Sequence, residues 1–223
     1  MAEVAADTDE VKEMQASLAG RQLLIGVDRL DYSKGLMQRL LAYERLLERY
    51  PNSQTQVTLM QLAPPTRAGV RAYEEIRESL EQASGRINGR FATSNWVPIR
   101  YLNKGVARQP LMGFFRSAAV GLVTPVRDGM NLVAKEFIAA QDPDDPSVLV
   151  LSSLAGAAAE LQDAIIVNPH DRDNVADGIA LALNMTLEER RERHSRLLDV
   201  LRKNDITAWR TRFLDALMAA AIP

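Results

Sequence analysis

The sequence contains no cysteine and only two histidines, His170 and His194, among its 223 residues. The absence of cysteine excludes a disulfide framework, a zinc–thiolate site and a cysteine nucleophile. Two histidines alone cannot form a histidine-rich metal site. A chain without cysteine is compatible with the reducing cytoplasm, which we expect to be its location.

Long apolar runs and charge blocks are absent as well. The apolar run at 147–154 is far shorter than the roughly 20 residues that span a bilayer. Residues 1–7 lack the basic and then apolar pattern of a signal peptide. The 27 Lys and Arg and 29 Asp and Glu are scattered, with a net charge of −2. We therefore expect neither a membrane nor a nucleic acid as a partner.

What is present is a regular alternation of short apolar runs with longer helical patterns. The apolar content of 47% and charged content of 25% are those of a globular protein with a real core. Strands are predicted at 22–27, 56–63, 95–101, 119–124, 147–152 and 164–167, and helices at 35–50, 70–83, 110–117, 131–140, 175–183, 187–201 and 206–220. This alternation indicates an α/β fold, a parallel sheet with helices on both faces.

Parallel sheets bind ligands beyond the carboxyl ends of their strands. Four loops are therefore the places to examine, at 28–34, 64–67, 125–131 and 152–157.

The first loop carries Arg29 and Lys34 between a strand and a helix. A guanidinium and an ammonium there can converge on one anion, and Gly35 allows a phosphate to approach the backbone. The alternative is that both cations only solvate the loop.

The second loop carries Asp128, Gly129 and Asn131 before a predicted helix that contains Glu136. Asn131 is a typical N-cap, and a helix N-terminus offers free N–H groups to a diphosphate or to sugar hydroxyls. Glu136 could accept hydrogen bonds from a ribose diol. The alternative is that Asp128 and Glu136 only balance the helix dipole.

Several other features have simpler explanations. Arg67 after the second strand is weak evidence alone, and the small residues at 152–157 fit close packing as well as ligand approach. The aspartates at 142–146 are ordinary turn chemistry rather than a metal cluster. Trp209 and Phe213 share one helix face, for which we expect burial, against this domain or another.

Three segments together resemble the trehalose-6-phosphate synthases. They are 26–35 (GVDRLDYSKG), 121–136 (GLVTPVRDGMNLVAKE) and 151–161, and the shorter segments 85–89, 101–103 and 166–169 also fit. The likeness extends from Leu23 to Leu217. It implies a Rossmann-like domain, the C-terminal half of a retaining glycosyltransferase of the GT-B type.

The resemblance also implies roles for individual residues. Arg29 and Lys34 would clamp the donor diphosphate. Asp128, with the backbone of Gly129, Met130 and Asn131, would hold the transferred glucosyl unit. The nucleotide would contact Leu132, Val133 and Val106, its ribose would bind Glu136, and Arg67 would bind the phosphate of glucose 6-phosphate. The implied catalytic residues are Arg29, Lys34 and Asp128.

The implied reaction transfers glucose from UDP-glucose to glucose 6-phosphate with retention, giving trehalose 6-phosphate and UDP. The resemblance also implies that a donor phosphate oxygen would help to take the acceptor proton. The positive charge of the site serves the departing diphosphate, so neither a cofactor nor a metal is expected.

The length of the chain adds an expectation about domains. Residues 1–20 are predicted to form an acidic helix or tail, and residues 21–223 the nucleotide-sugar-binding domain. The family's N-terminal domain is absent from the chain, so we expect weak donor binding and negligible transfer by the chain alone. Use of an ADP- or GDP-sugar, a non-catalytic sugar-nucleotide-binding or regulatory module, and oligomerisation all stay open.

Overall fold

A parallel six-stranded sheet forms the centre of the computed structural model, which describes residues 5, 7–65 and 71–220. Neighbouring strands pair in parallel in the order β3-β2-β1-β4-β5-β6. The strands are β1 (Gln22–Val27), β2 (Val57–Leu62), β3 (Ile99–Leu102), β4 (Val120–Val123), β5 (Val148–Ser152) and β6 (Ile165–Val167). The predicted α/β class and parallel sheet are confirmed.

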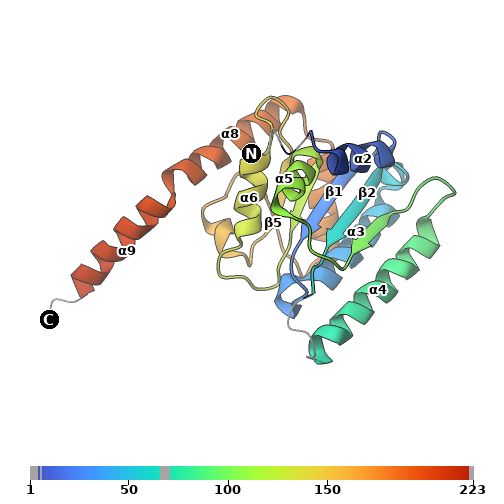
Figure 1. Cartoon of the computed structure of the whole chain (residues 1–223), viewed down its shortest axis with the longest axis horizontal. Helices are drawn as coiled ribbons and strands as arrows, with labels where there is room; N and C mark the ends of the chain where they lie inside the picture. Colours follow the sequence, from blue (N-terminus) through green and yellow to red (C-terminus); the bar gives the residue numbers. More distant parts are fainter. Residues whose placement is uncertain (1–4, 6, 66–70, 221–223) are drawn as a thin grey trace.

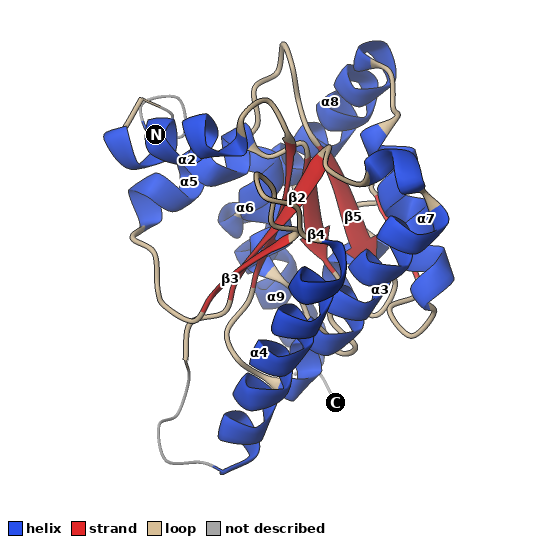
Figure 2. Ribbon diagram, turned by 90° about the vertical axis from the view of Figure 1, so that its right-hand side faces the viewer, coloured by secondary structure: helices blue, strands red, loops and turns tan. Residues whose placement is uncertain are grey.

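Helices cover both faces of this sheet (Figure 1). The α-helices are α2 (Asp9–Leu18), α3 (Leu36–Arg49), α4 (Arg71–Phe91), α5 (Arg108–Ser117), α6 (Leu132–Ala140), α7 (Arg172–Leu183), α8 (Leu187–Lys203) and α9 (Ile206–Ala220), and the 3₁₀ turns are η1 (Tyr32–Lys34), η2 (Pro51–Ser53) and η3 (Gly156–Ala159). Figure 2 shows α3, α4 and α7 on one side of the strands, with α2, α5 and α6 on the other.

The apolar strands explain why both faces are covered. Side chains alternate between the faces of a strand, and in β1 Leu24 enters the core with α3 while Leu23 and Ile25 enter the core with α5 and α6. A strand that is apolar on both faces must be buried on both, as in other α/β proteins.

Two elements differ by more than three residues from their predicted bounds. Helix α4 runs to Phe91 rather than ending at 83, because the buried stripe continues to Ile87 and Gly85 and Gly89 face open space. A helical glycine costs only about 1 kcal/mol relative to alanine, which the packing of this stripe overcomes. Strand β3 begins at Ile99 rather than 95.

The two ends of the chain pack differently. Helix α2 lies within the predicted N-terminal segment and buries Val11, Met14 and Leu18 in the core shared with α5. Helix α9 projects away from the body (Figure 1) and leaves Trp209 51% and Phe213 53% exposed, with their rings stacked 5.3 Å apart. The expected burial of these two rings therefore does not occur against this domain. None of the described helices is both long and apolar enough to cross a bilayer.

A charged cluster joins α3 to α4 and leads to a prediction about acid stability. Glu44 is 7% exposed and accepts hydrogen bonds from both terminal nitrogens of Arg86, at 2.6 and 2.7 Å, and from Arg90 at 3.1 Å. The hydrogen bonds from Arg86 outweigh burial and lower the pKa of Glu44 below its ordinary 4.5. We expect Glu44→Gln to lower the free energy of unfolding at pH 7 by about 1–2 kcal/mol, since both arginines are half exposed.

The sign of the pH dependence follows from the direction of that shift. A lowered pKa stabilises the fold above about pH 4.5, and this stabilisation is lost as the pH falls through the folded-state pKa. Urea unfolding at pH 7 and at pH 3 should therefore show a difference between wild type and Glu44→Gln that narrows in acid. Equal midpoints at pH 7 would contradict the prediction.

Candidate functional site

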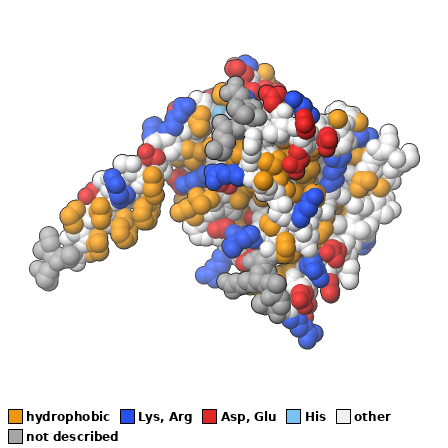
Figure 3. Space-filling model, in the orientation of Figure 1, with side chains coloured by type: hydrophobic (Ala, Val, Ile, Leu, Met, Phe, Trp, Pro, Cys, Tyr) orange, Lys and Arg blue, Asp and Glu red, His pale blue; other side chains and the backbone are white. Residues whose placement is uncertain are grey.

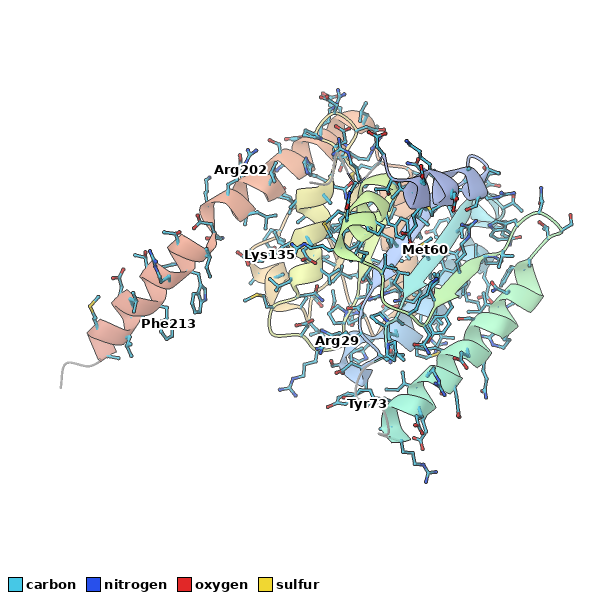
Figure 4. All side chains as sticks on the ribbon, in the orientation of Figure 1. Arg29, Met60, Tyr73, Lys135, Arg202 and Phe213 are labelled. Carbon is cyan, nitrogen blue, oxygen red and sulfur yellow. The ribbon has the colours of Figure 1, made fainter. Side chains whose placement is uncertain are left out.

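The candidate site lies at the edge of the sheet where β1, β4 and β5 end. The loop after β1 begins with buried Asp28 and exposed Arg29. Asp31 then caps η1 by accepting hydrogen bonds from the N–H and the hydroxyl of Ser33, at 2.9 and 2.8 Å. This capped turn holds Lys34 immediately ahead of α3. Figure 4 shows Arg29 on the lower edge of the molecule.

The loop after β4 is organised around Asp128. Its carboxylate accepts hydrogen bonds from Lys34 Nζ at 2.7 Å, from Asn131 Nδ2 at 3.0 Å and from the N–H of Met130 at 3.2 Å. Asn131 adopts a left-handed φ of 79° and caps α6 by accepting from the N–H of Ala134 at 3.1 Å. The predicted N-cap is therefore confirmed, and the ion pair joins two loops that are far apart in the sequence.

Backbone hydrogen bonds also hold these loops together. The carbonyl of Ser33 accepts from the N–H groups of Val126 and Arg127, at 2.9 and 3.1 Å. The N–H of Gly156, in the loop after β5, donates to the carbonyl of Asp128 at 2.8 Å. The loops after β1, β4 and β5 thus form one assembly.

The charges of the site are partly shielded from water. The side chains of Lys34 and Asp128 are 18% and 14% exposed. Burial raises the pKa of Asp128, but the hydrogen bonds from Lys34 and from the Met130 N–H outweigh burial, so the net pKa lies below its ordinary value. Asp128 is therefore ionised at neutral pH. Arg29 forms no ion pair within the described residues, so its charge is available to a ligand.

The N-terminus of α6 adds hydrogen-bond donors beside this pair. The N–H of Ala134 is used by Asn131, whereas the N–H groups of Leu132 and Val133 have no acceptor in the described part of the chain. Free N–H groups and the helix dipole together favour an anion or a polar oxygen at this point.

One turn further along α6, Glu136 faces a cation. Arg108 Nη2, at the start of α5, lies 3.5 Å from Glu136 Oε1, and their side chains are 71% and 35% exposed. Val106, two residues before Arg108, packs on the core of that face. Leu132 is 62% exposed, which leaves an apolar surface beside Glu136.

Arg67 lies outside the described residues. The loop that carries it begins beside the first loop, because the carbonyl of Pro64 accepts a hydrogen bond from the N–H of Leu30 at 3.0 Å.

Sequence reasoning missed part of the surface around Asp128. A cavity of about 470 Å³ is bordered by Asp128, Leu154, Gln162 and Ile166 among other residues. The sequence predicts that the loop at 152–157 follows a strand, but nothing local marks Gln162 or Ile166 as neighbours of Asp128. The pairing of β5 with β6 brings Ile166 to this edge. Two other cavities, of about 340 and 520 Å³, open at the opposite edge where strands begin, so we do not associate them with this site.

The assembled groups can bind a phosphorylated sugar ligand. Arg29 and Lys34 supply positive charge, and the start of α6 supplies N–H donors. The carboxylate of Asp128 can accept hydrogen bonds from the hydroxyl groups of a sugar. Within residues 5, 7–65 and 71–220, no group of three His, Asp or Glu side chains is arranged to hold a metal ion.

Comparisons with known proteins agree on one relationship. Residues 3–219 match the profile of glycosyltransferase family 20. The trehalose-6-phosphate synthase of Klebsiella pneumoniae is 54% identical over 208 residues, which cover 93% of this chain and 44% of the relative. The chain therefore spans about half the length of the curated relatives it matches.

Solved structures give the same picture. The α,α-trehalose-phosphate synthase (UDP-forming) of Burkholderia xenovorans in complex with glucose-6-phosphate matches with a TM-score of 0.95 and 52% identity, covering 97% of this chain and 48% of that one. The Escherichia coli trehalose-6-phosphate protein bound with UDP-2-fluoro glucose matches with a TM-score of 0.92 and 49% identity, covering 97% and 50%.

Proposed function

Because the chain belongs to glycosyltransferase family 20, we propose that it is the donor-binding domain of a retaining trehalose-6-phosphate synthase. The reaction transfers glucose from UDP-glucose to glucose 6-phosphate and releases UDP. The observation that carries this proposal is the convergence of Lys34, Asp128 and the N–H donors at the start of α6 at one edge of the sheet. The ligands bound in two solved relatives, glucose-6-phosphate and UDP-2-fluoro glucose, support this choice of substrates.

Arg29 and Lys34 bind the donor diphosphate in this proposal. Negative charge grows on the diphosphate as its bond to the anomeric carbon breaks, and cations already in place stabilise that charge. The proton of the acceptor hydroxyl passes to a donor phosphate oxygen, so the protein need not supply a general base. That no metal or cofactor is needed stays a prediction.

The loop after β4 holds the glucosyl unit. Asp128 is ionised and already accepts hydrogen bonds, so sugar hydroxyls can replace or share its donors. The backbone of Gly129, Met130 and Asn131 follows directly, in a conformation set by the left-handed residue and the N-cap. A positioned donor and acceptor react faster because the entropic cost of alignment is met on binding.

The nucleotide lies along the start of α6 in the same proposal. Leu132 and Val133 offer an apolar surface and N–H groups that have no acceptor among the described residues, and Val106 contributes from the segment before α5. A ribose diol binds Glu136 and displaces or reorients Arg108, whose 3.5 Å contact is weak at this exposure. Arg67 binds the phosphate of the acceptor.

A second domain completes the site and covers α9. The relatives are about twice as long as this chain, and helix α9 presents a stripe of large apolar side chains to solvent (Figure 3). The exposed apolar residues of α9 are Ile206, Trp209, Phe213, Leu214, Leu217 and Met218. Water-exposed apolar patches of this kind mark interfaces. We propose that the half of the relatives this chain does not match packs against this stripe; the cytoplasmic location stays a prediction.

Donor binding is tested by thermal unfolding of the chain with UDP, UDP-glucose, ADP and GDP. We expect uridine ligands to raise the melting temperature, because a ligand at 100 times its Kd stabilises the folded state by about 2.7 kcal/mol. Arg29→Ala should remove this shift without lowering the melting temperature of the free protein, since Arg29 is exposed and forms no ion pair within the described residues.

Arg202→Ala is the matched control. Arg202 is an exposed arginine on α8 (Figure 4), paired only with neighbouring Asp199 at 3.6 Å among the described residues, and its loss should leave the uridine shift unchanged. If ADP or GDP raises the melting temperature and the uridine ligands do not, the donor is another sugar nucleotide rather than UDP-glucose. No shift with any nucleotide would overturn the proposal that this chain binds the donor.

A further inference from the structure

Arg39 is a fully buried arginine that the proposed reaction does not yet use. It lies in the first turn of α3 and is 0% exposed. By volume it is the largest fully buried side chain among the described residues. Arginine is almost never fully buried unless its donors are paired, so the contacts of its guanidinium explain why it is there.

The guanidinium contacts the ends of three strands. Its Nε donates to Thr124 Oγ1 at 3.0 Å and its Nη1 to Gln61 Oε1 at 2.9 Å. Its Nη2 lies 2.7 Å from Asp28 Oδ2, a charge contact that is not aligned as a hydrogen bond. Asp28 follows β1, Gln61 belongs to β2 and Thr124 follows β4, so one side chain joins three strand ends.

Two neighbouring residues, Gln61 and Gly26, accommodate the guanidinium of Arg39. The side-chain N–H₂ of Gln61 donates to the carbonyls of Gly26 and Leu62, at 3.2 and 3.1 Å, which turns its oxygen toward Arg39. A Cβ on Gly26 would lie 2.6 Å from Arg39 Nη1 and from Gln61 Oε1. The glycine therefore leaves the space that the guanidinium occupies.

Two of the three contacts connect directly to the candidate site. Asp28 is followed in the chain by Arg29, and Thr124 begins the segment that leads to Asp128. Asp28 is also close enough to Lys34 and Asp128 for their charges to act on it: burial raises the pKa of Asp28 most, the Arg39 and Lys34 charges lower it, and the Asp128 charge raises it. The Asp28–Arg39 pair is therefore close enough to the Lys34–Asp128 pair for the charges of the two pairs to interact.

We propose that Arg39 is a positioning residue for the donor diphosphate, holding the loops after β1 and β4 at the separation at which Arg29, Lys34 and the start of α6 meet one diphosphate. This inference rests on the proposed function, because it assigns Arg39 a role in the same site. Arg39 reaches no ligand itself and acts through Asp28 and Thr124.

Lysine cannot replace arginine here. The guanidinium is a planar fork whose Nε and two terminal nitrogens reach three acceptors in fixed directions, whereas an ammonium is a single point charge on a flexible stem. Arg39→Lys keeps the charge that balances Asp28 and loses the geometry, so it separates positioning from charge compensation.

The test is the ratio of the affinities for UDP and UMP, measured by calorimetry. A residue that positions the diphosphate cations should affect the second phosphate more than the nucleoside. We expect Arg39→Lys to lower the UDP:UMP affinity ratio by about tenfold and Thr124→Val, which keeps the volume and removes one acceptor, by about twofold to threefold. A merely structural role would weaken both ligands equally or change only the melting temperature.

Arg45→Lys is the matched control, because it makes the same change on the same helix at a partly exposed arginine that pairs with Asp173 and Glu48. Its ratio should equal that of wild type. Should Arg39→Lys fail to fold by circular dichroism, Thr124→Val decides the question alone. If the wild type binds UDP and the folded variants have its UDP:UMP affinity ratio, only the positioning role is overturned. If the wild type does not bind UDP, the proposed function is overturned and this inference with it.

Discussion

Gly35→Ala is expected to lower the free energy of unfolding by about 2–5 kcal/mol and to abolish UDP binding. Gly35 has a φ of 66°, in the left-handed region that side chains with a Cβ rarely adopt. A Cβ there would also lie 2.3 Å from the carbonyl oxygen of Thr124. That neighbour is backbone, which cannot rotate away, so relief requires the loops after β1 and β4 to separate.

Separation of these loops is also what would remove the ligand site. Ser33 holds the second loop through Val126 and Arg127, and Lys34 holds it through Asp128. Displacing the backbone at Gly35 moves Lys34, the adjacent residue, away from the diphosphate. Loss of UDP binding should therefore accompany the loss of stability in urea unfolding.

Gly89→Ala is a control with the same chemical change and the opposite expected sign. Gly89 lies inside α4, and a Cβ there meets nothing within 4 Å. Alanine should raise the stability by about 0.5–1 kcal/mol, because it loses less backbone entropy in a helix, and leave UDP binding unchanged. A Gly35→Ala protein with wild-type stability would show that the first turn of α3 can move without harm.

Transfer activity should depend on a second domain attached through α9. The chain alone is expected to form no appreciable trehalose 6-phosphate from UDP-glucose and glucose 6-phosphate. Supplying the half of the Klebsiella pneumoniae relative that this chain does not match should raise the rate by on the order of 10³-fold or more, since alignment of two bound substrates can contribute this much. Product formation measured by chromatography tests this directly.

The apolar stripe of α9 supplies the matched variants for that experiment. Trp209→Asp with Phe213→Asp places two charges on the exposed stripe, where an apolar partner would have to bury them. The double variant should keep the UDP-induced melting shift and lose the gain in transfer. Asp215→Ala, an exposed change elsewhere on α9, should behave as wild type.

Each other outcome has a defined meaning. Appreciable transfer by the chain alone would show that one domain suffices. Full activity of the double variant would place the domain interface elsewhere. A UDP-induced shift without transfer, even with the second domain bound, would favour a sugar-nucleotide-binding module over an enzyme.

Much of the fold follows from local patterns. The apolar run of β1 and the amphipathic run of α3 were predicted within one residue of their observed bounds, because burial on both faces and helical periodicity are properties of contiguous sequence. Helix α4 was predicted too short, since glycine signals at 85 and 89 suggest an end that the packing of Ile87 overrides. Local propensity is a weak guide where tertiary packing opposes it.

Arg39 shows the same limit for the site. Helical spacing places it on the apolar face of α3 with Leu36 and Tyr43, unlike Arg45 on the same helix, and it is fully buried. Nothing in the local sequence, however, indicates which groups its guanidinium contacts. Its role depends on the pairing of β1 with β2 and with β4, which brings Gln61 and Thr124 to either side of the end of β1.

Local patterns in the chain were enough to predict the α/β class and the loops at the strand ends, because strand periodicity, helix caps and turn residues act over a few neighbouring positions. The three-dimensional structure was needed to learn that Lys34 and Asp128, 94 positions apart, lie 2.7 Å from one another. It was also needed to learn that the guanidinium of Arg39 contacts three strand ends and that the stripe of α9 remains exposed. The first two of these facts depend on which strands are neighbours in the sheet. That order follows from burying all the apolar surfaces together, and no short segment contains it.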